Sequence, residues 1–283
     1  KDANGKEFAL RTVEKKPDQV VALPFQGTFV REFLDDATSA QHPYSALIVA
    51  PVSKAVGVPC SVPTIGVVAA DSSLGMYRKL YEGKVCLNEE REPLGKTENT
   101  EDALKDLQKD NDNSYDAHNF LKARMLDVLF ADWDRHGDQF RFFNKNPKGE
   151  DKYFLIIPRD RDMVLNITQG LLPTLAKRLF LMPRVFGFKG NVMSGSNYYL
   201  YKSGFMNAHP ASQISYEDWM KLANEFRSEV TDEALEEGLK QFPKEIYAIK
   251  HDRQLQQLKQ RRDGIPAAMD KYYRLSNQIV DIH

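Results

Sequence analysis

The chain of 283 residues is poor in several features that mark specialised proteins. It has only two cysteines, Cys60 and Cys86, which can pair or stay free, so the redox compartment stays open. Lys+Arg number 39 against 40 Asp+Glu, and the net charge of −1 gives no reason to expect nucleic acid or an anionic membrane as a partner. No apolar run reaches the length of a membrane span, and there is no internal repeat or low-complexity tract.

The overall composition is that of an ordinary soluble globular protein, with 42% hydrophobic and 28% charged residues. A chain of this length can bury a sizeable core, in one large domain or in two smaller ones. It begins "KDANGKEFAL", without an initiator Met or a signal peptide, as a fragment or a processed form would.

Strands and short helices are expected in the first third of the chain. Apolar and β-branched residues predict three strands, at residues 6–14, 64–71 and 83–90. Helices are predicted at residues 27–43, ending near a proline, and at residues 44–58, ending near a glycine. The composition turns polar over residues 91–113, and we place a lobe boundary there, with one short helix.

The remainder is predicted to be mainly helical. A helix capped by Asn113 or Ser114 leads into "FADWDRHGDQFRFF", and the strand "DKYFLIIPRD" follows. Capping patterns start two more helices, at Ser215 and Thr231. A final long helix is expected to break near the Gly and Pro of residues 264–266, and its run "KQRRD" is expected on a solvated face.

Mixed sheet and helix therefore come first, and helices follow. This order predicts an α+β fold with two lobes. The sheet-containing lobe would span residues 1–92, and the mainly helical lobe would span residues 93–283.

Two short segments crowd acidic side chains together. In "FADWDRHGDQFRFF", acids and one imidazole occupy four alternate positions directly after the apolar helix: Asp132, Asp134, His136 and Asp138. In "IIPRDRDMVL", Asp160 and Asp162 follow a strand. Charges this dense repel one another unless a cation or a substrate joins them. We therefore predict that the two segments form one site.

Phosphoryl transfer is a chemistry that uses such residues. It requires an acid that accepts the proton of the nucleophile, oxygen ligands for Mg²⁺ and a cation that holds the nucleotide phosphates. In protein kinases an amide ligand follows the catalytic Asp by five residues, and a separate Asp after a strand binds metal. Here Gln139 stands five residues after Asp134, and the strand "YFLII" presents Asp160 and Asp162.

The motif D-R-H-x-x-Q after an apolar helix, followed by a strand ending in "PRDRD", resembles the catalytic segment of atypical kinases. The nearest such families are phosphatidylinositol kinases, bacterial HipA-type serine kinases and spore-coat CotH-type kinases, which carry D-R-H-x-x-N or close variants. More narrowly, "LRTVEKKP", "DDATSAQHPYSALIVAPVSKAVGV", "DWDRHGDQFRF" and "IPRDRD" resemble a kinase-like domain of Bacteroidetes-type bacteria, often joined to metallophosphoesterase or outer-membrane barrel segments. This narrower resemblance covers most of the chain and implies a two-lobed, protein-kinase-like fold.

The resemblance also implies roles for the acidic segments. Asp134 would be the catalytic acid–base, and Asp160 would be the main ligand of Mg²⁺ (or Mn²⁺). Gln139 and Asp162 would complete the metal site. The cofactor would be ATP, and its γ-phosphate would pass to a hydroxyl acceptor of unknown identity, on a protein or a small molecule.

In the first lobe the resemblance places Arg11 where kinases hold a strand Lys. An acid on the next helix, Glu32 or Asp36, would be its ion-pair partner. The connector "LNEERE", with Glu90, would lie where an adenine ring meets backbone groups. Two residues would brace the catalytic loop, Arg135 and His136.

Three departures from the family pattern keep a second function open. Gln139 replaces the usual Asn, Arg11 replaces the usual Lys, and no Gly-rich phosphate loop is visible. A non-catalytic module that binds a nucleotide or a partner, within a larger envelope protein, would also fit these features. The localisation stays open, since the relatives' association with the envelope conflicts with the scarcity of ATP outside the cytoplasm.

A metal-dependent hydrolase is the third hypothesis. Asp134, His136 and Asp138 alternate, so a strand would project all three to one side, as suits Zn²⁺ or Mn²⁺. The chain has only six histidines, and the others form no paired ligand motif. A Mg²⁺-dependent phosphotransferase is therefore the leading hypothesis.

Overall fold

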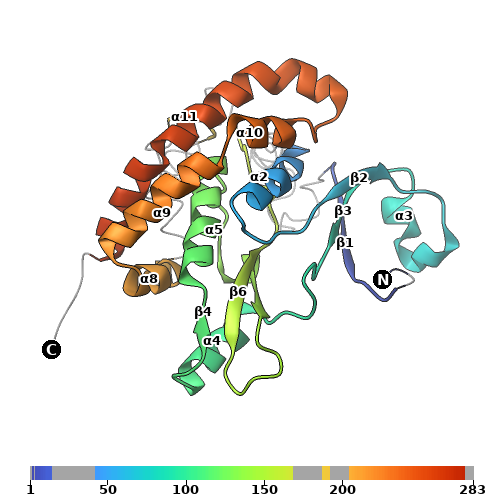
Figure 1. Cartoon of the computed structure of the whole chain (residues 1–283). Coiled ribbons are helices and arrows are strands. Elements are labelled where there is room, and N and C mark those ends of the chain that lie inside the picture. Colours follow the sequence, from blue (N-terminus) through green and yellow to red (C-terminus); the bar gives the residue numbers. More distant parts are fainter. Residues whose placement is uncertain (1, 3, 15–41, 168–186, 192–203, 278–283) are drawn as a thin grey trace, which may run out of the picture.

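The structure of the chain, a computed structural model, describes residues 2, 4–14, 42–167, 187–191 and 204–277. Within these residues the predicted α+β class is confirmed: two three-stranded sheets lie beside a group of helices (Figure 1), while the kinase-like two-lobed arrangement stays a prediction. The predicted helix at residues 27–43 lies almost entirely outside the described residues. The α-helices and 3-10 helices (η) are, in chain order, η3 (Ser45–Ile48), α2 (Val49–Ala55), η4 (Ser72–Tyr77), α3 (Arg78–Tyr81), α4 (Thr100–Lys109), α5 (Ala117–Phe130), η5 (Gly137–Gln139), α8 (Gly204–Gln213), α9 (Tyr216–Glu229), α10 (Asp232–Leu239) and α11 (Lys244–Ser276).

The first sheet, sheet A, contains the three strands predicted for the first third of the chain. β1 (Phe8–Thr12), β3 (Val85–Glu90) and β2 (Thr64–Val67) are antiparallel, in the order β1-β3-β2. The register pairs Leu87 of β3 with both Arg11 and Ile65. Since directly opposed residues share a face of a sheet, one face of sheet A carries Arg11 beside apolar side chains.

The second sheet, sheet B, brings the two acidic segments together. β5 (Phe140–Asn144) and β6 (Tyr153–Pro158) form an antiparallel pair, and β4 (Ser114–Tyr115) lies parallel to β6. The start of β5 is opposite the end of β6, so residues 131–139 before β5 adjoin residues 159–162 after β6. A small aromatic core fixes this sheet against α4 and α5: Ala103, Tyr115, Phe120, Phe140, Phe142, Phe154 and Ile156.

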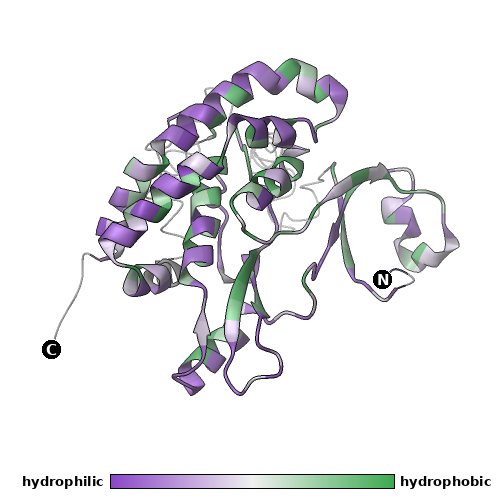
Figure 2. Ribbon diagram, viewed as in Figure 1, coloured by the Kyte–Doolittle hydropathy of each residue, from purple (hydrophilic) through white to green (hydrophobic). Residues whose placement is uncertain are grey.

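α5 is the central helix of the larger core. Nearly all of its residues are buried, because apolar side chains lie on all its sides and α9, α10 and α11 contribute to the same core. Figure 2 shows hydrophobic and hydrophilic residues alternating along α9 and α11, as expected of helices with one face on the core. Across this core Trp219 donates its indole N–H to the carbonyl of Met269, at 3.0 Å.

η3 and α2 join the two predicted lobes. Both lie within residues 1–92, yet both pack against α10, and their apolar residues belong to the larger core. Gly238 of α10 allows this close approach: a Cβ there would lie 2.9 Å from the carbonyl oxygen of Ile48.

The helix starts were predicted well where a capping pattern was present. Ser215 accepts a hydrogen bond from the backbone N–H of Asp218, and Thr231 caps α10 in the same way. The predicted cap of α5 was wrong. Asp116, and not Asn113 or Ser114, accepts the capping bond, because β4 occupies the residues just before it.

Two predictions for the last helix were wrong. α11 runs unbroken through Pro266, whose missing N–H costs one backbone hydrogen bond while the flanking Ile265 and Met269 stay buried in the core. The "KQRRD" run is not wholly solvated either. Arg261 is buried and donates to the carbonyls of Val128 and Leu129, in the last turn of α5.

Candidate functional site

The first acidic segment starts where α5 ends. Ala131 adopts a left-handed conformation (φ 57°), which stops the helix and turns the chain toward sheet B. Asp134 follows in a half-buried position, and Arg135 next to it is fully buried. The turn thus leaves the candidate base partly accessible while burying its neighbour.

Arg135 ties the two acidic segments to each other. Its guanidinium donates to the carbonyl oxygens of Gln139 (2.9 Å), Arg159 (2.6 Å) and Asp160 (3.1 Å), and lies 4.9 Å from the centre of the Phe140 ring. One side chain therefore holds the backbone on both sides of the site. The structure brings together the segments that we expected to form one site.

A buried cluster of charges lies beneath the two segments. Asp127 of α5 accepts hydrogen bonds from Arg124 and Arg161, and its Oδ1 lies 3.4 Å from Nε of Arg135. Arg161 also donates to Asp132 at 3.0 Å. All five side chains are buried, so each charge depends on the others for compensation.

The pKa values in this cluster reflect that dependence. Burial alone would raise the pKa of Asp127, but the guanidiniums of Arg161, Arg135 and Arg124 outweigh it and lower the pKa. Burial likewise opposes the charge of Arg161, and the carboxylates of Asp127 and Asp132 outweigh it and raise its pKa. We expect Asp127 and Arg161 to form a charged pair.

Arg11 links sheet A to the second acidic segment. Its guanidinium contacts Glu89 at 2.5 Å and Asp160 at 3.6 Å. Burial alone would lower the pKa of Arg11, but the carboxylates of Asp160 and Glu89 outweigh it and raise the pKa. The sequence did not suggest Glu89 as a partner, and the two predicted partners, Glu32 and Asp36, lie outside the described residues.

Glu90 does not share the face of Arg11. Its carboxylate pairs with Lys6 at 2.8 Å, and its carbonyl accepts a hydrogen bond from Ser61 at 2.6 Å. Because side chains alternate along a strand, Glu89 lies on the face that carries Arg11. Of these two neighbouring acids, Glu89 is the one beside the acidic segments.

Asp160 and Gln139 offer two oxygen atoms suited to a cation. Oδ1 of Asp160 and Oε1 of Gln139 are buried, and neither accepts a hydrogen bond from the residues that the structure describes. Asp160 also has a left-handed backbone (φ 55°), a conformation that is uncommon outside glycine, that Asp adopts more readily than most residues and that recurs at functional sites. With the half-buried Asp162, they make a donor set of hard oxygens, the kind that Mg²⁺ prefers. These oxygens are the type of ligand that a magnesium ion would use.

The residues of the hydrolase hypothesis are less well placed. The segment from Asp134 to Asp138 is not a strand, and it enters η5, so alternation does not point the three side chains to one side. The side chain of Asp138 is 96% exposed, and its Oδ2 lies 3.7 Å from Nδ1 of His136. Among the described parts of the chain, no three His, Cys, Asp or Glu side chains are grouped as metal ligands, and this holds for Asp134, Asp160 and Asp162 as well as for the hydrolase residues.

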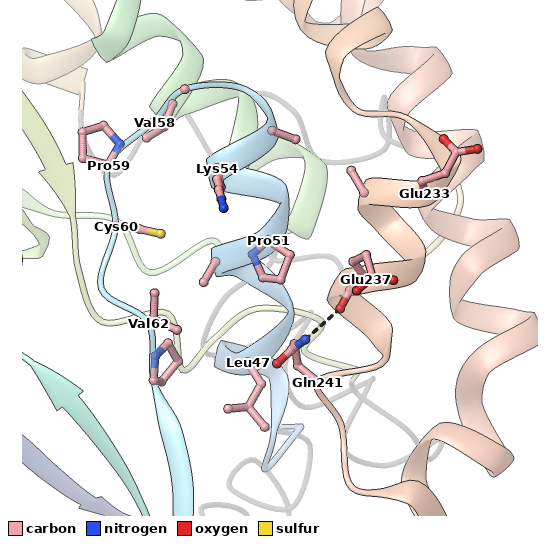
Figure 3. A pocket seen from close by; sticks show the side chains of 15 residues that line it. Leu47, Pro51, Lys54, Val58, Pro59, Cys60, Val62, Glu233, Glu237 and Gln241 are labelled. Atoms are coloured by element: carbon pink, nitrogen blue, oxygen red, sulfur yellow. Dashed lines mark hydrogen bonds between the residues drawn. The ribbon is translucent and has the colours of Figure 1, made fainter.

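A separate hollow of about 960 Å³ lies between α2, residues 57–63 and α10 (Figure 3). Its walls are mainly apolar, with Pro51, Val58 and Val62 among them, and Cys60 also lines it. Cys60 and Cys86 are both free thiols, and burial raises the pKa of Cys60. No residue of the two acidic segments lines this hollow, so it is distinct from the candidate site.

Comparison of the chain with protein-family models, with curated proteins and with solved structures found no match. In the described residues, no helix combines the length and the apolar composition that crossing a membrane requires.

Proposed function

We propose that the chain is a Mg²⁺-dependent phosphotransferase that moves the γ-phosphate of ATP to a hydroxyl acceptor. The observation that carries this proposal is the contact between Arg11 and Asp160, 3.6 Å apart. It joins a cation suited to phosphate with a carboxylate suited to metal, at the junction of sheet A and the acidic segments. Phosphoryl transfer uses both groups side by side.

Each residue of the site would have a defined role. Gln139, Asp160 and Asp162 would hold Mg²⁺, which when bound neutralises charge on the phosphates. Arg11 would hold the phosphates from the other side, oriented by Glu89. Asp134 would accept the hydroxyl proton as the acceptor oxygen bonds to the γ-phosphorus and the bond to the β-phosphate oxygen breaks, releasing ADP.

The face of sheet A that carries Arg11 supports binding of a nucleotide base. Leu87 and Ile65 lie on this face by register, and so do Val67 and its partner Val85. Val67 is 66% exposed and Val85 40% exposed. An exposed apolar surface next to a phosphate-binding cation suits a molecule with a flat ring and a charged tail.

The proposal is tested by thermal unfolding with and without Mg²⁺ and ATP. Ligand at 100 times its Kd stabilises the native state by about 2.7 kcal/mol, so wild type should unfold at a higher temperature. Asp160→Ala should lose this shift, whereas Asp263→Ala, which removes an exposed carboxylate of α11, should retain it. If wild type shows no shift, the proposal is wrong.

Transfer is then tested separately from binding. Asp134→Asn should still bind Mg²⁺ and ATP but transfer phosphate roughly 10²–10⁴-fold more slowly, the usual contribution of a general base. Binding without transfer in wild type, for a broad set of hydroxyl acceptors, would indicate the non-catalytic module. If activity depends on Asp138 and the protein binds Zn²⁺ in place of Mg²⁺, the result would indicate the hydrolase.

A further inference from the structure

Arg159 occupies a fixed position at the end of β6. Its backbone N–H donates to the carbonyl of Gln139 at 2.8 Å, and its own carbonyl accepts from Arg135 at 2.6 Å. It directly precedes Asp160, and sheet register places it opposite Gln139. The backbone is thus held at both its N–H and its carbonyl, between two of the predicted metal ligands.

The guanidinium of Arg159 is half-buried and has no hydrogen bond or ion pair with any residue in the described ranges. Its charged neighbours differ in this respect. Arg11 pairs with Glu89, Arg91 lies 3.8 Å from Glu7, and Arg141 donates to Thr97. A fork of five N–H donors is therefore left unused beside the candidate site.

The surroundings of Arg159 are unfavourable for a cation. Its guanidinium is half-buried, and the charges of three other guanidiniums, those of Arg91, Arg141 and Arg11, act on it together with the carboxylate of Glu89. A cation that is withdrawn from water among like charges costs free energy unless an anion compensates it. Within the described residues the chain supplies no carboxylate in contact with it, so an anion from outside is the natural partner.

We propose that Arg159 contacts a phosphate group in the bound state, beside Arg11 and Asp160. This rests on the proposed function. A guanidinium binds phosphate through two parallel hydrogen bonds, which suits the fixed backbone at this position. The phosphate belongs either to ATP or to an acceptor that already carries one, and the experiment separates these sources.

The test measures binding by calorimetry to wild type, Arg159→Ala and Arg159→Lys, with ATP and Mg²⁺, adenosine and pyrophosphate as probes. Losing a charge-assisted contact should weaken binding of ATP roughly 10- to 100-fold in Arg159→Ala and leave adenosine within about twofold. Arg159→Lys should recover part of the loss, because it restores the charge without the fork. Arg78→Ala, which removes an arginine paired with Glu82 on α3, is the matched control and should match wild type.

The outcomes distinguish the two proposals. Loss of pyrophosphate binding with ATP binding intact would assign the contact to a phosphorylated acceptor and support the inference. Equal loss for adenosine and ATP would mean that Arg159 contacts the base, and unchanged affinity for ATP and pyrophosphate would mean no contact, so either overturns the inference. If wild type binds pyrophosphate through Arg159 but not ATP, the anion site stands and the proposed function fails. If wild type binds none of the probes, both fail.

Discussion

Asp127 is the residue on which the buried charge cluster depends most. Its carboxylate contacts Arg124 and Arg161 and lies 3.4 Å from Arg135, and all four side chains are buried. Asp127→Asn keeps the shape and removes the charge, leaving three buried guanidiniums, of which those of Arg135 and Arg161 still contact Asp132. Removing one partner of a buried pair costs about 3–5 kcal/mol, so we expect a loss of this size. For a chain of this length the midpoint of thermal unfolding should fall by roughly 5–10 °C.

The assay is unfolding by urea and by heat, followed by circular dichroism, without any ligand. The control is Asp263→Asn, which breaks an exposed ion pair with Arg262 and should cost less than about 1 kcal/mol. A cost below about 1 kcal/mol for Asp127→Asn would refute the reasoning, since it would mean that water or rearrangement compensates the guanidiniums. Equal costs for the two variants would refute it as well.

Two further predictions concern stability. Burial, with the nearby Lys250, lowers the pKa of His42 from 6.5 to about 4. Below pH 6.5 the imidazole therefore binds a proton in the unfolded chain but not in the folded chain. Stability from this group is complete above about pH 6.5 and is lost as the pH falls toward 4, by about 2 kcal/mol between pH 7 and pH 5. In His42→Phe the free energy of unfolding, measured by urea titration, should depend less on pH between pH 7 and pH 5. An unchanged pH dependence would contradict the role of His42. Gly238→Ala should lower stability by about 1–3 kcal/mol, because its Cβ would lie 2.9 Å from the carbonyl oxygen of Ile48. The control Gly66→Ala, whose Cβ meets no atom within 4 Å, should stay within about 0.5 kcal/mol in the same assay, and equal losses would exclude the steric cause.

The parts of the fold that depend on local pattern were predictable. The strands at residues 64–71 and 83–90, and the caps at Ser215 and Thr231, follow from residues adjacent in sequence. The meeting of the two acidic segments was also foreseeable, because a hairpin brings the residues before its first strand to those after its second. The sequence analysis reached the same juxtaposition by another route, from the crowding of charges and the resemblance to kinases, without predicting β5.

The burial of charge was not predictable in the same way. Arg261 lies in a run of charges that is typical of a solvated face, and only the packing of α11 on α5 buries it. Asp127 carried a usable signal that was missed. It lies on a helix with apolar side chains on all its sides, so a charge there has to be buried and paired.

The ion-pair partner of Arg11 could be predicted only from the register of sheet A. A kinase-like arrangement led us to expect an acid on the following helix, whereas Glu89 comes from β3, 78 residues away in the chain. Nothing in the local sequence distinguishes Glu89 from Glu90. The pairing of Ala9 with Glu89 decides which of the two acids faces Arg11.

The buried charge cluster stabilises the fold, whereas the acidic residues of the two segments above it are proposed to bind ligand. Asp127 and Asp132 are outnumbered by the three guanidiniums of Arg124, Arg135 and Arg161, so an excess of positive charge lies under the acidic segments. That excess lowers the electrostatic cost of placing Asp134, Asp160 and Asp162 on adjoining segments. Replacing Asp160 should therefore remove binding while the fold stays intact, whereas replacing Asp127 should weaken the fold itself. This separation is why a variant of Asp160 can test the chemistry of the site without confusing it with stability.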